Sequence, residues 1–148
     1  MARERLLRWT TALYVAGLAT HTADHVRRGV DVITPEVFWA GIVSTALGVL
    51  TAVLVFSRHR LAPSAAALVG VPIAAGVAAV HLLPHWSVLS DPFVGTGATG
   101  ITAESWTVVL LEIAGALGMG LAGIAMVRAQ RPGATRRVAP GTGPAAGR

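Results

Sequence analysis

The sequence contains no cysteine and no lysine, and only 13% of its 148 residues are charged. Without cysteine the chain has no disulfide framework, zinc knuckle, iron–sulfur cluster or catalytic thiol. Hydrophobic residues make up 53% of the sequence. A soluble protein of this size would have a larger share of charged residues and a smaller share of hydrophobic ones. These deficits indicate an integral membrane protein.

The net charge of +5 does not indicate a nucleic-acid ligand, because of where the basic residues stand. All 12 are arginines, placed at the chain ends and in short loops between apolar runs. Ten fall on the side of the two chain ends, and only Arg27 and Arg28 fall on the other. Membrane insertion favours basic residues on the cytoplasmic side. We therefore expect N- and C-termini in the cytoplasm of a cell-membrane protein, with the lipid bilayer as partner and no nucleic acid.

Long apolar runs predict an all-α membrane bundle of four spanning helices. Residues 37–56 and 61–80 contain no charge, and residues 105–127 contain only Glu112. Each run is long enough, because a helix needs ~20 residues to cross a ~30 Å hydrocarbon core. The first run is apolar only from Trp9 to Ala23, so it crosses only by including a snorkelling Arg8 and the polar residues from His21 onward. A signal peptide is the alternative for this segment, although no clear cleavage site follows it.

The expected transmembrane domain covers residues 1–128, with spans at about 6–28, 36–56, 62–85 and 103–127. Thr34 and Thr102 are candidate caps for the second and fourth spans. The four tryptophans fall at predicted interfaces, as in an aromatic belt: Trp9, Trp39, Trp86 and Trp106. Residues 129–148 are rich in Pro, Gly, Ala and Arg and predict a disordered basic cytoplasmic tail.

Small residues recur at four-residue spacing in the third and fourth spans, as in Ala66, Gly70 and Ala74 and in Ala116 and Gly120. Such faces let helix backbones approach closely. They predict packing within the bundle, or association into a homo-oligomer or a larger membrane complex.

Residues 95–100 match the glycine pattern of dinucleotide-binding folds. That pattern requires a preceding strand, which the sequence does not predict. We therefore interpret this segment as an external loop.

Four of the five histidines are predicted at one end of the bundle, the extracytoplasmic end. His21 pairs with His25, and His81 with His85, at a spacing that projects both members of a pair from one helix face. Neutral imidazole binds zinc, iron and copper, and a carboxylate can complete the ligand set. The candidate metal ligands are His21, Asp24, His25, His81, His85 and Glu104.

Glu112 stands inside the apolar fourth span, where an ionisable group normally faces the bundle interior. His21 is expected at a comparable depth, so a pair of His21 and Glu112 is a candidate proton relay or inner ligand set. Two alternatives remain open. The histidines could ligate haem, or the polarity could be structural, with Asp24 paired to Arg28 and Glu112 joining two helices as a protonated acid.

The histidine–aspartate–histidine–arginine cluster between His21 and Arg28 resembles that of uncharacterised small four-span membrane proteins of GC-rich bacteria, over most of the chain. The element His81-Leu-Leu-Pro-His85 resembles the His-x-x-Pro-His element of ZIP-family metal permeases, which implies histidines that bind a transported metal. Leu82 and Trp86 stand where that family usually has acids. The paired spacing is also similar to one histidine box of membrane di-iron hydroxylases and desaturases, but their other boxes are missing from the sequence.

The sequence thus predicts a polytopic membrane protein that holds a transition metal ion in a His and carboxylate site at the extracytoplasmic end. A haem-binding electron-transfer subunit and a non-enzymatic partner subunit of a membrane complex are the alternatives. No motif identifies a substrate or a reaction.

Overall fold

The computed structural model describes residues 1–95 and 100–130, without the side chain of Val30. Over these ranges the chain is all-helical, which confirms the predicted fold class at that level. The elements are α1 (Ala2–Arg28), the short 3₁₀ helix η1 (Val30–Val32), α2 (Pro35–Phe56), α3 (Ala62–Leu82) and α4 (Ala103–Gln130). Most of the glycine-rich loop, residues 96–99, and residues 131–148 of the predicted tail lie outside the described ranges.

Three of the helices, α2, α3 and α4, are long and apolar enough to cross a membrane. The 27 residues of α1 extend about 40 Å at the ~1.5 Å rise of an α-helix. Arginines near its start and His21, Asp24 and His25 near its end make α1 more polar than the other three. Length alone would therefore let α1 span a bilayer, whereas its composition is mixed.

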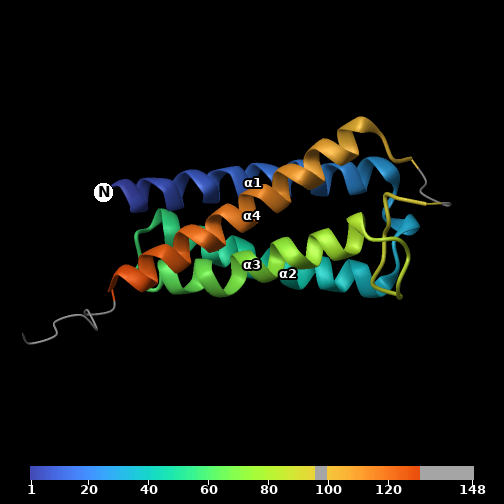
Figure 1. Ribbon diagram of the computed structural model, residues 1–148. Coiled ribbons are helices and arrows are strands. Elements are labelled where there is room, and N and C mark those ends of the chain that lie inside the picture. Colours follow the sequence, from blue (N-terminus) through green and yellow to red (C-terminus); the bar gives the residue numbers. More distant parts are fainter. Residues whose placement is uncertain (96–99, 131–148) are drawn as a thin grey trace, which may run out of the picture.

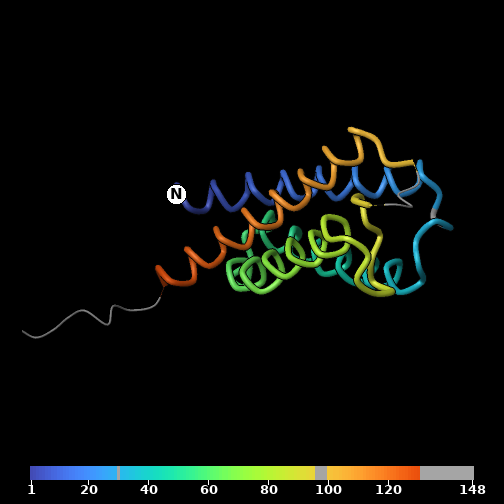
Figure 2. The backbone as a smooth tube through the Cα atoms, turned by 45° about the vertical axis from the view of Figure 1, so that its right-hand side comes forward, coloured from blue at the N-terminus to red at the C-terminus, as the bar shows by residue number. Residues whose placement is uncertain are grey.

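Helix α4 holds the bundle together, because α1 and α3 both pack along it (Figures 1 and 2). Helix α2 lies beside α3 and packs less closely against the rest. The start of α1, the turn between α2 and α3, and the last turn of α4 share one end of the bundle (Figure 1). The segments that follow α1 and α3 share the opposite end, so chain segments distant in sequence meet there.

Glycines set the contact between α1 and α4. A Cβ atom added at Gly17 would lie 2.6 Å from the Glu112 Cα atom, and one added at Gly115 would collide with the Tyr14 backbone. Gly70 of α3 meets Gly120 of α4 in the same way, with 2.6 Å from the added Cβ to the Gly120 nitrogen. The small-residue spacing thus predicts packing within the chain correctly, and association with other chains stays a prediction.

Both predicted helix caps are present. The Val37 N–H donates to the Thr34 hydroxyl at 3.2 Å at the start of α2. At the start of α4 the Ser105 N–H donates to the Thr102 hydroxyl, and the Thr102 N–H donates to the Ser105 hydroxyl at 3.2 Å. These bonds satisfy N–H groups that have no partner within the helix.

Helix α3 ends three residues earlier than predicted, at Leu82 instead of residue 85. Leu83 is extended, with φ −88° and ψ 150°, because Pro84 disfavours a helical conformation in the residue before it. The expectation that His81 and His85 share a helix face is therefore wrong. The first and last helices extend past their predicted limits, since α1 begins at Ala2 and α4 continues to Gln130.

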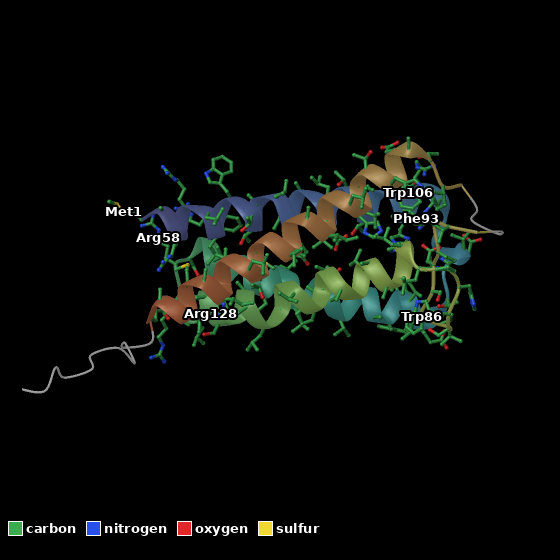
Figure 3. The ribbon with its side chains drawn as sticks, viewed as in Figure 1. Met1, Arg58, Trp86, Phe93, Trp106 and Arg128 are labelled. Carbon is green, nitrogen blue, oxygen red and sulfur yellow. The ribbon has the colours of Figure 1, made fainter. Side chains whose placement is uncertain are left out.

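The segment after α3 folds back over the end of that helix. It satisfies three carbonyls that α3 leaves without helical partners: Ala79 O accepts from Trp86 Nε1, Val80 O from the Asp91 N–H and His81 O from the Phe93 N–H. Trp86, Phe93 and Trp106 gather at this end, whereas Met1, Arg58 and Arg128 lie at the other (Figure 3). This folded segment encloses the end of the bundle that carries the histidines.

Candidate metal centre

Three histidines from two helices meet at the enclosed end of the bundle. His21 and His25 lie one turn apart on α1, and His81 lies in the last turn of α3. One ring nitrogen from each lies within 4.8 Å of the other two. The exposed fraction is 6% for His21 and 3% for His81, and His25 is half-buried. The predicted convergence of distant histidines is therefore present for three of the four.

His21 bonds to the buried acid of α4. Its Nδ1 atom lies 2.5 Å from Glu112 Oε2, and both side chains are buried. The close approach of the two helices at Gly17 brings the Glu112 backbone beside the turn that precedes His21. The predicted His21 and Glu112 pair is formed. Among the described residues nothing bonds to His21 Nε2, which is buried. With its proton on Nδ1 toward Glu112, the ring has a lone pair on Nε2 for a metal ion.

His81 is oriented by the segment that folds back over α3. Its Nδ1 atom donates to the Asp91 carbonyl at 2.9 Å, which leaves the lone pair on Nε2. The ring packs against Phe93, with 4.7 Å between ring centroids. Backbone and aromatic contacts thus fix both the position and the tautomer of this ring.

His25 is held differently, because its Nδ1 lies 3.0 Å from Arg28 Nη2. A guanidinium group can only donate, so Nδ1 accepts and the neutral ring carries its proton on Nε2. To bind a metal ion, His25 must either exchange the Arg28 bond for the ion at Nδ1 or lose the Nε2 proton. In the arrangement observed, His25 offers a hydrogen-bond donor beside the other two rings.

Two arginines and two acids frame the histidines. Arg27 Nη2 lies 2.7 Å from Asp24 Oδ1, and Arg28 Nη2 lies 2.6 Å from Asp91 Oδ2. Arg28 also reaches Asp24, with 3.3 Å between Nε and Oδ2 but without hydrogen-bond alignment. The Ser105 hydroxyl of α4 donates to Asp24 at 3.1 Å. Asp24 is therefore engaged by arginines and lies outside the group of three histidines.

Asp91 is a charged anchor of the folded segment. Burial would raise the pKa of its carboxyl, but the hydrogen bonds and the charge of Arg28 outweigh burial and hold the pKa below its usual value of 3.8. Asp91 therefore stays ionised and keeps Arg28 over the Phe93 ring, 5.3 Å from guanidinium carbon to ring centroid.

The remaining predicted ligands lie apart. His85 is exposed beyond the end of α3, and Glu104 is exposed in the first turn of α4. Neither belongs to the group formed by His21, His25 and His81.

Sequence reasoning did not single out Asp91, Phe93 or Ser105. Asp91 is the one acid between α3 and α4, and it follows the third span on the same side as Arg27 and Arg28. That pattern was a usable signal for an ion pair. The roles of Phe93 and Ser105 depend on the path of the folded segment, which no spacing in the sequence encodes.

The histidines form part of the wall of a cavity of about 810 Å³ between α1, α2 and α3. His21, His25, His81 and Glu112 line it at one end, and most of the remaining wall is apolar.

No protein-family model, no curated protein and no solved structure matches the chain.

Proposed function

We propose that the chain is a four-span membrane protein that binds a transition metal ion through His21, His25 and His81 at its extracytoplasmic end. The observation that carries the proposal is the convergence of three ring nitrogens within 4.8 Å of one another in a largely buried site. Zinc, iron and copper all accept neutral imidazole, so the donor set leaves the choice among them open.

The hydrogen bonds made by the Nδ1 atoms of His21 and His81 support the proposal. Metal-binding histidines usually donate the second ring N–H to a carboxylate or a backbone carbonyl, which fixes the ring and makes the ligating nitrogen more basic. Here His21 bonds to the Glu112 carboxylate, and His81 donates to the Asp91 carbonyl. Glu112 thus acts as an orienting group behind His21.

The distances between the ring nitrogens are slightly longer than those around a bound zinc ion. Nitrogens held 2.0–2.1 Å from one zinc ion lie roughly 3.3 Å apart in a tetrahedral set. The largest separation of 4.8 Å would have to shrink by roughly 1.5 Å, which small side-chain rotations supply. Three protein ligands leave a fourth position free, as in zinc sites that bind water or substrate.

The arrangement of charge supports four spans with N-in and C-in orientation. Helix α1 packs along α4 over most of its length, so the two helices share a depth in the bilayer. Arg27 and Arg28, the two arginines predicted outside, are paired to Asp24 and Asp91, whereas the other ten arginines follow the positive-inside rule.

Haem has less support. Axial ligation by two histidines needs rings on opposite faces of the macrocycle, whereas these three rings lie together with centroids 4.7 to 5.5 Å apart.

Metal analysis of detergent-purified protein tests the proposal. We expect about one zinc, iron or copper ion per chain, and loss of that ion in His21→Ala and His81→Ala. The matched controls are His85→Ala and His59→Ala, which remove exposed histidines and should keep the ion. Metal content that is equally low in all five proteins after metal loading would contradict the proposal.

A further inference from the structure

The cavity beside the histidines is large, elongated and apolar. Its volume of about 810 Å³ lies in the range of ligand pockets. Along α3 it extends from Leu68 to His81, which is about 20 Å of helix. Its long walls include Leu18, Val37, Leu47, Leu68, Ile73 and Val77. A cavity of this shape fits a hydrocarbon chain that lies parallel to the helices.

The histidines and the one acid that line the cavity lie at one end. His21, His25, His81 and Glu112 meet there, and the buried Nε2 of His21 has no hydrogen-bond partner among the described residues. The Nε2 proton of His25 provides a hydrogen-bond donor beside this nitrogen. A ligand therefore needs an oxygen group at one end, where this donor and the free metal position lie.

Charge at this end favours an anionic head. Arg27 is paired with Asp24 and Arg28 with Asp91, so the charges within each pair cancel. A divalent ion bound by three neutral imidazoles would bring positive charge into this buried site. A carboxylate on the ligand would offset this charge, and uncompensated buried charge is costly.

The cavity opens to the outer surface of the helices. Phe38, Ile42 and Leu47 of α2 line it and are 40%, 47% and 47% exposed. A Cβ atom added at Gly41 of α2 or at Gly76 of α3 would meet nothing within 4 Å. In a membrane these exposed apolar groups face lipid, so an amphiphile can enter sideways from the bilayer.

We propose that this cavity binds a long-chain carboxylate, with its hydrocarbon chain between α1, α2 and α3 and its carboxylate at the free position of the metal held by His21, His25 and His81. The proposal rests on the metal site argued above and names the class of molecule that reaches it.

Oleate binding to the metal-loaded, delipidated protein tests the inference. Gly76→Phe and Gly41→Phe place a ring in the cavity from α3 and from α2, at two lining positions where an added Cβ atom meets nothing within 4 Å. Ala75→Phe is the control, exposed on α3 outside the cavity lining. We expect saturable binding that both glycine variants weaken roughly tenfold or more while they keep the metal and the α-helical content, and that Ala75→Phe leaves unchanged.

A second readout places the head group. With Cu²⁺ in the site, a fatty acid spin-labelled near its carboxylate should broaden more strongly than one labelled at the far end of its chain. Equal oleate binding by wild type and both glycine variants, with the metal retained, would overturn the inference. So would conversion of a dimer to a monomer by Gly76→Phe, because a second copy of the chain would then fill the cavity. Failure of the metal proposal would be detected separately, because the wild type would then contain no bound metal.

Discussion

At the scale of single residues, the site depends on a carboxylate buried in an apolar helix. Glu112 is 4% exposed, and a buried carboxylate is costly unless it is paired. His21 provides the partner at 2.5 Å, so each group lowers the cost of burying the other.

Replacing Glu112 with Gln should weaken metal binding roughly 10- to 100-fold, the usual effect of removing an outer hydrogen-bond partner. The amide still accepts a hydrogen bond from His21 but carries no charge, so the fold is expected to persist. Titration with Zn²⁺ in detergent measures the change. Glu104→Gln alters an exposed acid and should match the wild type; equal losses in the two variants would refute a specific role for Glu112.

Asp91 predicts a pH dependence of stability. Because Arg28 holds the pKa of this carboxyl below its usual 3.8, the ionised group stabilises the fold fully above that value and loses its effect as the pH falls below it. Wild type should exceed Asp91→Asn by about 1–3 kcal/mol near neutral pH, the range for a charge-assisted bond. Thermal unfolding in detergent should show this gap narrowing as the pH falls from 3.8 through the lowered pKa of Asp91, whereas a gap that does not narrow below pH 3.8 would count against the ion pair.

The sequence predicted part of this residue-level chemistry. Helical spacing was enough to predict that His21 and His25 share a face and that His21 and Glu112 have similar depths. It could not predict which ring nitrogen carries a proton, because the Asp91 carbonyl and the Arg28 side chain decide the tautomers. The Asp91 carbonyl contact arises from the fold of residues 83–95, which also brings the Asp91 carboxylate to Arg28.

At the scale of helices, glycines control how closely α1, α3 and α4 approach. A side chain at Gly115 would collide with the Tyr14 backbone, whereas one at Gly41 would meet open space. An added side chain should therefore destabilise the bundle at Gly115 and be tolerated at Gly41.

Gly115→Val should destabilise the bundle by about 1–3 kcal/mol or more through overpacking against a backbone that cannot move aside. Gly41→Ala should be neutral or stabilise by about 0.5–1 kcal/mol, because glycine weakens a helix interior. Thermal unfolding followed by circular dichroism compares them. A stable Gly115→Val protein with unchanged metal content would show that α1 and α4 do not need this close approach.

The described residues form four α-helices close to the predicted ranges, but one boundary mattered for the site. A span to residue 85 kept His81 and His85 on one face, whereas Pro84 ends α3 at Leu82. The rule that a proline restricts the residue before it was available from the sequence, and applying it would have removed His85 from the ligand set.

At the scale of the whole molecule, the account requires the histidine end to face away from the cytoplasm. The natural lack of cysteine makes the chain a ready background for single-cysteine labelling. Ser57 lies in the turn after α2, and Val88 lies in the exposed segment after α3, at opposite ends of the bundle.

Val88→Cys should react with a membrane-impermeant maleimide added to intact spheroplasts, and Ser57→Cys should react only after lysis. The physical reason is the excess of arginines at the Ser57 end. The reverse pattern would invert the proposed orientation, and labelling of both positions from outside would show that α3, the one helix between them, does not cross the membrane.

X-ray absorption spectroscopy of the zinc-loaded protein tests the central claim most directly, because it reports the atoms around the ion. The account predicts nitrogen ligands at about 2.0–2.1 Å with the outer-shell scattering of imidazole, reduced in amplitude in His25→Ala and unchanged in His85→Ala. A shell of oxygen atoms without imidazole scattering would contradict it.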